Sequence, residues 1–243
     1  SNIQQERQKE LEAGVDIGVF DSKVILEATY YNKTVEDLIL FQNTQPSTGS
    51  STRVVNGGEL RNRGVELGLS TTPIESPAFK WDAKTSFWLN RSEITELNIA
   101  PFALGAFGSG YGTFFIEEGA SATQIVGVTA DGVRKIGDAT PDFQMNFQNF
   151  FTVKQNLTFS FLLHWKKGGD NVNLTQLLFD ASGTTADYDE DDDGDGVING
   201  VDRLSSGTAE TWVQDASYLR LREIGLYYTI PKVALSSVFG NVV

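Results

Sequence analysis

Residues 156–170, NLTFSFLLHWKKGGD, decide the fold class of this chain. Apolar side chains occupy every second position, with mostly polar ones between them, and the apolar set is Leu157, Phe159, Phe161, Leu163 and Trp165. Because successive side chains of a β-strand point to opposite faces, the segment predicts a strand with one apolar and one polar face. About ten such residues suffice for a tilted strand to cross a bilayer, but the pattern also fits a surface strand of a soluble sandwich.

The same alternation recurs along the chain and predicts about seven strands and the start of an eighth. The expected strands lie at 12–20, 24–41, 57–70, 79–97, from 143 up to the turn that begins at 153, 157–167, 218–230 and, cut short, 238–243. The polar stretch 1–11 is expected to be a helix or a loop. The sheet should therefore be antiparallel and connected in simple order.

The connections between these strands alternate in length. Short ones are expected at 21–23, 71–78, 153–156 and 232–237, and long ones at 42–56, 98–138 and 171–215. Two short strands are expected inside the second long loop, at 112–116 and 124–128. An up-and-down meander puts every second connection at the same end, as in outer-membrane barrels with long extracellular loops and short periplasmic turns. A Greek-key sandwich has no reason to sort its loops this way.

We therefore expect an all-β fold, an antiparallel up-and-down transmembrane β-barrel of which the chain supplies seven to eight strands. The main alternative is a secreted, calcium-stabilised β-sandwich that binds carbohydrate or mediates adhesion. The two differ in where the apolar faces lie, because a sandwich buries them and a barrel exposes them to lipid.

Composition excludes several function classes. The net charge of -13 argues against a nucleic-acid partner, which needs a basic face. No cysteine and a single histidine leave no disulfide framework, thiolate chemistry or histidine-built centre. No nucleophile with a partnered base and no cofactor motif occurs, so we do not expect an enzyme. No apolar run is long enough for a transmembrane helix, and no signal peptide opens the sequence.

Several motifs resemble SusC-like TonB-dependent transporters, the RagA/SusC family. They occur in the family's order over nearly the whole chain and are Glu6-Arg7, Glu12-Ala-Gly-Val-Asp16, Thr29-Tyr-Tyr-Asn-Lys33, Asn62-Arg-Gly-Val-Glu-Leu67, Gly137-Asp138, Pro141-Asp-Phe143, Trp165-Lys-Lys-Gly-Gly-Asp170 and Asp215-Ala-Ser-Tyr-Leu-Arg-Leu-Arg222 running to Pro231. The last motif is the most specific. Since most of them are strand and turn motifs, they indicate architecture more than substrate.

The resemblance implies a component of an outer-membrane active transporter in a Gram-negative bacterium. Such a protein imports oligosaccharides or peptides, is energised through TonB, and works with a SusD-like surface lipoprotein. A whole member would also carry an N-terminal plug, a TonB-contacting segment and about 22 strands. We therefore expect residues 1–243 to be the C-terminal portion of a receptor barrel, surrounded by outer-membrane lipid, with its long loops extracellular.

The acidic stretch 191–202, DDDGDGVINGVD, matches a twelve-residue calcium loop. In such a loop positions 1, 3, 5, 7, 9 and 12 supply oxygen ligands, and position 6 is glycine. Only one frame puts Gly196 at position 6 and a ligand at position 12, and it predicts a structural Ca²⁺ bound by Asp191, Asp193, Asp195, the Val197 carbonyl, Asn199 and Asp202. Helix-forming flanks are weak, so an isolated loop of weak affinity is expected; the alternative is a solvated acidic loop.

Other polar and aromatic residues are expected to serve the barrel. His164 lies on the polar face of its strand, as a hydrogen-bonding residue. Arg220 and Arg222 should share one strand face that lines the lumen. Four aromatic residues should form an interfacial girdle and not a ligand platform, and they are Trp81, Trp165, Tyr30 and Tyr228.

Overall fold

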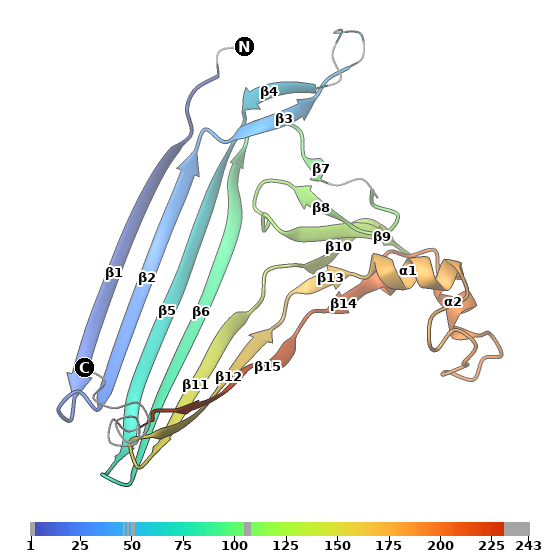
Figure 1. Cartoon of the computed structure of the whole chain (residues 1–243). Helices are drawn as coiled ribbons and strands as arrows, with labels where there is room; N and C mark the ends of the chain where they lie inside the picture. Colours follow the sequence, from blue (N-terminus) through green and yellow to red (C-terminus); the bar gives the residue numbers. More distant parts are fainter. Residues whose placement is uncertain (1–2, 46, 48, 50–51, 105–107, 231–243) are drawn as a thin grey trace.

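The computed structural model describes residues 3–45, 47, 49, 52–104 and 108–230 (Figure 1). Its main element is a seven-stranded antiparallel sheet in the order β1-β2-β5-β6-β11-β12-β15. The strands are β1 (Arg7–Val19), β2 (Val24–Glu36), β5 (Gly58–Glu75), β6 (Phe79–Leu97), β11 (Phe143–Val153), β12 (Leu157–Lys167) and β15 (Tyr218–Tyr228). Each strand pairs with the sheet strands that precede and follow it along the chain, so the prediction of an up-and-down antiparallel sheet is confirmed.

All shorter elements lie in the long connections, at one end of the seven-stranded sheet, here termed the loop end; the other is the turn end (Figure 1). They form a hairpin of β3 (Ile39–Asn43) and β4 (Thr52–Asn56), a four-stranded sheet of β7 (Phe102–Leu104), β8 (Thr113–Ile116), β9 (Gln124–Thr129) and β10 (Gly132–Asp138), and a segment with β13 (Asp170–Val172), α1 (Leu174–Ala181), α2 (Asn199–Ser205), the 3-10 helix η2 (Glu210–Trp212) and β14 (Val213–Asp215). Neither α-helix in the described part of the chain is long and apolar enough to cross a membrane.

The register keeps apolar side chains on one face of the main sheet from edge to edge. One row of cross-strand partners contains Val15, Ala28, Leu67, Phe87, Met145 and Trp165. Partners one position along, such as Glu66 and Trp88, lie on the opposite face. As the period-two alternation predicts, Val15, Val65, Leu67, Phe159 and Phe161 therefore share one face, opposite Glu66, Ser160 and His164. We call the two sides the apolar face and the polar face.

The apolar face is open, which decides against the sandwich. Phe159 and Phe161 stack on Phe151 of the neighbouring strand at centroid distances of 6.3 and 6.2 Å, so they contact residues of their own sheet. Phe159 is 40% exposed and Leu226 is 71% exposed. Within the described residues no second sheet covers this face. A soluble sandwich would bury these side chains against a partner sheet.

Several predicted boundaries were wrong. β1 begins at Arg7, inside the stretch 1–11 expected to be a helix or loop, because its polar residues pair with β2 beyond the alternating segment. β5 continues to Glu75 through the predicted turn 71–78, with register shifts near Thr71 that accommodate Pro73. The strand expected at 24–41 is interrupted at Asp37, whose φ of 60° turns the chain into β3. The strand expected at 238–243 lies outside the described residues.

The long loops hold more structure than predicted. The two short strands expected in 98–138 are confirmed as β8 and β9, but β7 and β10 extend them into a sheet. The loop 42–56 includes most of the β3–β4 hairpin, and 171–215 contains two helices that were not predicted. Each of these elements is too short for periodicity to separate from loop sequence.

A network of charged residues fixes α2 against α1. Arg203 donates to both carboxylate oxygens of Asp180 at 2.7 Å and to those of Asp187 at 2.8 and 3.1 Å. Asp180 is 1% exposed and also accepts a hydrogen bond from Thr185. The hydrogen bonds from Arg203 outweigh burial and hold the pKa of Asp180 below its usual range. Stabilisation from this carboxylate is therefore complete above its unfolded pKa of about 4, and it is lost as the pH falls through the lower folded value.

Close backbone approach requires Gly64 in the middle of β5. A Cβ there would lie 2.4 Å from the Tyr31 ring and 2.5 Å from the Leu89 carbonyl oxygen. The ring covers the glycine, and its hydroxyl donates to Asn90 Oδ1 at 3.1 Å. Tyr31 and Gly64 therefore interlock strands β2, β5 and β6 on the polar face.

We predict that Gly64→Ala in the full-length protein lowers the free energy of unfolding by about 1–3 kcal/mol, because the added methyl group overpacks this contact. Gly18→Ala is the matched control, since its Cβ would lie 3.7 Å from the nearest atom, Ser22 Oγ. Thermal unfolding in detergent measures both. Equal shifts for the two variants would contradict the interlock.

We predict that Arg203→Gln lowers the free energy of local opening of residues 174–205 by about 3–5 kcal/mol, because the buried Asp180 loses its counter-charge. Hydrogen exchange should show lost protection in this segment and unchanged protection in β11 and β12. Arg134→Gln removes an exposed ion pair to Asp131 and should change little. Intact protection of 174–205 in Arg203→Gln would refute the network's role.

Candidate functional site

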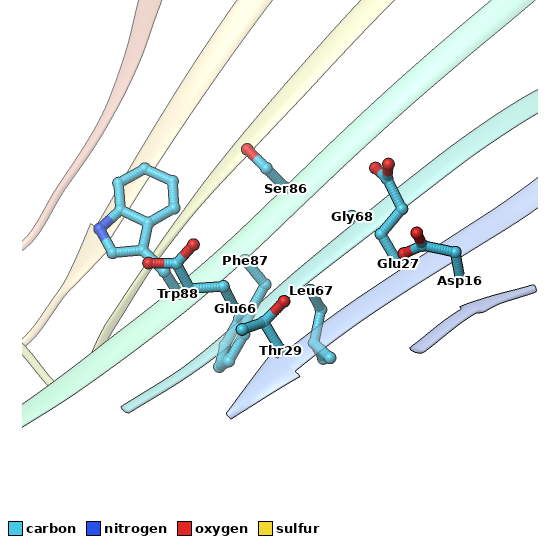
Figure 2. Close-up of a pocket in the computed structure, with 9 residues that line it drawn as sticks. All are labelled: Asp16, Glu27, Thr29, Glu66, Leu67, Gly68, Ser86, Phe87 and Trp88. Carbon is cyan, nitrogen blue, oxygen red and sulfur yellow. The ribbon is translucent and has the colours of Figure 1, made fainter. Parts of the chain in front are cut away.

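The polar face carries an open hollow of about 510 Å³ over strands β1, β2, β5 and β6. It is lined by Asp16, Glu27, Thr29, Glu66, Leu67, Gly68, Ser86, Phe87 and Trp88. Figure 2 shows the carboxylates of Asp16 and Glu27 next to each other and that of Glu66 beside the Trp88 indole. None of these three acids makes an ion pair or a side-chain hydrogen bond within the described residues. The hollow therefore presents free negative charge next to an aromatic ring.

The sequence alone does not predict this hollow. Its residues come from four strands, and only the cross-strand register brings them together: Asp16 opposite Glu27, and Glu66 between Thr29 and Trp88. The period-two alternation identified the face of each residue. Its neighbours depend on turn lengths and bulges that the pattern does not encode.

The predicted polar residues lie where expected. His164 is on the polar face and contacts Gln144 Oε1 at 3.3 Å. Arg220 lies opposite His164, with its guanidinium 4.0 Å from the Tyr218 ring centroid. A bulge at Arg222 interrupts the pairing of β15 with β12, and Arg222 Nη2 reaches the Tyr218 hydroxyl at 3.4 Å. Both arginines therefore lie on the polar face, while the extra residue of the bulge lets Leu221 and Ile224 share the apolar face.

The four aromatic residues predicted for a girdle lie on the apolar face. Trp165, Tyr30 and Tyr228 are 38%, 46% and 63% exposed. Trp81 donates from its indole N–H to Asn149 Oδ1 at 3.0 Å. All four therefore lie on the face that a girdle at the boundary between lipid and water requires.

The structure brings together half of the predicted calcium ligands. Carboxylate oxygens of Asp191, Asp193 and Asp195 lie within 4.8 Å of one another, and all three residues are exposed. Asp191 also accepts the N–H groups of Gly194 and Gly196, at 2.8 and 3.0 Å. Three convergent carboxylates form the kind of oxygen-rich donor set that Ca²⁺ prefers.

Two of the other predicted ligands, Asn199 and Asp202, are arranged differently. Asn199 Oδ1 accepts the N–H of Asp192 at 3.2 Å, and its amide donates to the Asp192 carboxylate at 3.0 Å. Asp202 lies in the first turn of α2 and is not among the three grouped carboxylates. The expectation of weak helical flanks was wrong on this side. Helix α2 begins at Asn199, and the ion pair between its Arg203 and Asp180 holds it in place.

Motifs far apart in the sequence meet at one place, here termed the loop-end junction, formed by residues 137–142, 168–170 and 215–217. β13 pairs with β14 so that Asp170 lies opposite Asp215, and Asp170 Oδ2 accepts the N–H of Asp138 at 2.8 Å. Ser217 Oγ accepts the N–H of Gly168 at 2.7 Å. The junction therefore holds the ends of β11, β12 and β15 to the loop strands.

Gly169 has a φ of 78°, and a Cβ there would lie 2.8 Å from the Ala139 carbonyl oxygen. Its own carbonyl accepts the N–H of Ala216 at 2.8 Å. The glycine pair that ends the β12 sequence is thus required by both backbone angle and close approach.

Two junction carboxylates are held in the charged form. Burial alone would raise the pKa of Asp138, but hydrogen bonds from Thr123, Thr140 and Ser121 outweigh it and place the pKa below the usual range. Ser217 donates its hydroxyl and N–H to Asp215 and lowers that pKa too. Both carboxylates stabilise the junction above their unfolded pKa values, and the effect disappears as the pH falls through the lower folded values.

Comparison with known proteins identifies the family. The family model described as "TonB dependent receptor-like, beta-barrel" matches residues 1–242. Among curated proteins, TonB-dependent receptors P3 and P26 of Formosa agariphila are 26% and 25% identical, each aligned over 95% of this chain and 28% of the relative. The chain thus spans less than a third of the length of these relatives.

Solved structures show the same fold. The chain superposes on the RagAB peptide transporter with a TM-score of 0.72 and 20% identity, covering 98% of this chain and 30% of the other. Against the RagAB peptide importer in the "open-open" state the TM-score is 0.69, with 17% identity over 96% of this chain and 29% of the other. The seven-stranded open sheet is accordingly part of a larger barrel, and the chain belongs to the TonB-dependent receptor-like β-barrel family.

Proposed function

We propose that residues 1–243 are the C-terminal portion of an outer-membrane receptor barrel that imports peptides or oligosaccharides. Energy would reach it through TonB, and a SusD-like surface lipoprotein would work with it. The observation that carries this proposal is the sheet's strict division into an exposed apolar face and a charged, hydrogen-bonding polar face. In a barrel, the first faces lipid and the second a watery lumen. The proposal includes no catalytic activity.

The relatives support the finer parts of the proposal. Two of the solved neighbours are titled as a peptide transporter and a peptide importer. The loop end holds every long connection, so we assign it to the extracellular side, where a surface lipoprotein could contact β7–β10 and the α1–α2 segment.

Uptake by cells carrying the full-length receptor tests the function. Fluorescent peptides and oligosaccharides are supplied to wild-type cells and to cells lacking TonB or the co-expressed surface lipoprotein. We expect uptake of one class that is abolished without TonB and reduced without the lipoprotein. Uptake that persists without TonB would refute active import.

We predict that Phe161→Arg destabilises the full-length barrel by about 2–4 kcal/mol, because it places a charge against lipid. Leu162→Arg is the matched control, since Leu162 lies opposite Gln148 and Glu223 on the polar face and its arginine would reach water. Unfolding in lipid vesicles measures both. A larger loss for Leu162→Arg would reverse the assignment of the faces.

Calcium at the acidic turn remains a prediction, with Asp191, Asp193 and Asp195 as its core ligands. We expect millimolar Ca²⁺ to bind and to protect residues 185–205 from hydrogen exchange, with oxygen ligands at about 2.3–2.6 Å. Mg²⁺ should substitute poorly because it requires a tighter octahedron. Asp193→Ala should abolish both effects, whereas Asp131→Asn, on the β9–β10 hairpin, should not. Absence of binding heat in calorimetry would show a solvated acidic loop.

A further inference from the structure

Two adjacent rows of cross-strand partners cross the polar face at mid-height. The first row runs Thr29, Glu66, Trp88, Gln144, Lys166, Tyr218, and the second runs Asp16, Glu27, Gly68, Ser86, Asn146, His164, Arg220. In both rows the acids lie on β1, β2 and β5, and the cations lie on β12 and β15. The charge along the rows therefore changes from negative on β1, β2 and β5 to positive on β12 and β15.

These charges are available to a ligand. Within the described residues, Asp16, Glu27 and Glu66 form no ion pair, and neither does Lys166 or Arg220. Arg220 only lies over the Tyr218 ring. Opposing charges lie outside the two rows: Lys33 faces Glu10, and Lys84 faces Ser70 and Gln148. Lys166 also lies close enough to Asp215, at the loop-end junction, to help lower the pKa of that carboxyl group. Separated and unpaired, the two groups create a field directed along the sheet from β12–β15 toward β1–β5.

The middle of the rows is neutral and suited to amide groups. Gln144, Asn146 and Ser86 offer donors and acceptors, and Asn146 Nδ2 contacts Ser86 Oγ at 3.3 Å. The Trp88 and His164 rings meet edge to face at a centroid distance of 5.8 Å. Side-chain amides hydrogen-bond peptide groups, and aromatic rings pack against side chains without regard to their sequence.

The spacing fits a short peptide. Strands in a sheet lie about 4.8 Å apart, so Glu66 and Lys166, three strands apart, are separated by about 14 Å along the sheet, and Glu27 and Arg220, five strands apart, by about 24 Å. An extended peptide rises about 3.4 Å per residue. A chain of about four to seven residues would span these distances between its terminal charges.

We propose that these rows orient short peptides with free termini. The ammonium group faces Asp16, Glu27 and Glu66, the carboxylate faces Lys166 and Arg220, and the neutral middle contacts the peptide backbone. This inference rests on the proposed import function and names its substrate class. The other candidate occupant of the same face is the plug that the full-length receptor carries, and the experiment separates the two.

Calorimetry on the full-length receptor with its plug provides the test. The probe is a pentapeptide of neutral residues in four forms: with free termini, N-acetylated, C-amidated, and blocked at both ends. The receptor forms are wild type, Glu66→Gln and Lys166→Gln. Asp131→Asn and Arg134→Gln are the controls, because they neutralise exposed charges on the β9–β10 hairpin.

We expect the free peptide to bind best and each blocked terminus to weaken binding about two- to fivefold, the range for solvent-exposed ion pairs. Glu66→Gln should weaken binding of the free peptide by a similar factor and leave binding of the N-acetylated peptide unchanged. Lys166→Gln should likewise weaken binding of the free peptide and leave binding of the C-amidated peptide unchanged. Added salt should remove the differences.

Equal affinity for all four peptides, or losses in the variants that ignore which terminus is blocked, would overturn the proposal. So would variants that loosen the plug toward protease while leaving peptide affinity unchanged, since the plug would then occupy the rows. TonB-dependent peptide uptake without terminal preference would leave the import function standing and remove only this inference. Import of oligosaccharides with no peptide binding would likewise leave the import function standing and overturn this inference, whereas absence of TonB-dependent uptake of either class would remove both.

Discussion

The structure depends on a register that keeps the apolar side chains of all seven long strands on the same face of the sheet. A slip of one residue at any pairing would move a whole strand's apolar set from one face to the other. The bulge at Arg222 preserves the arrangement, because its extra residue leaves both Leu221 and Ile224 on the apolar face. Backbone pairing, packing and the placement of charges are therefore one constraint, and the polar rows exist because it holds from β1 to β15.

The sequence predicted the long strands, whose alternating pattern repeats along the chain, and missed most of the short elements in the long loops. The recurring alternation located all seven long strands, and the observed bounds of β6 are those expected. Short elements such as α2 contain too few residues for a period to appear, and their positions depend on tertiary contacts such as the Arg203 network. The predicted calcium ligands fall between these cases, because local spacing brought Asp191, Asp193 and Asp195 together, while α2 carries Asp202 in a helical turn.

The loop-end junction gives the family motifs a common physical reason. Read along the chain, Gly137-Asp138, Gly168-Gly169-Asp170 and Asp215-Ala216-Ser217 are unrelated fragments. In space they form one hydrogen-bonded cluster in which glycines permit close approach and carboxylates accept backbone N–H groups. A motif that specifies how strands leave a sheet contacts no substrate, which explains why these residues indicate architecture.

The small sheet β7–β10 also affects how the chain assembles. β6 and β11 are neighbours in the main sheet although residues 98–142 separate them, and closing a flexible loop costs more entropy as it lengthens. The small sheet folds most of this segment on itself, and Ile94 exchanges backbone hydrogen bonds with Gly119 and Ala120, which attaches it to the end of β6. Once it has formed, β11 starts its search for β6 from nearby. The insertion thus acts kinetically as a short connection, which lets a meander with long excursions assemble hairpin by hairpin.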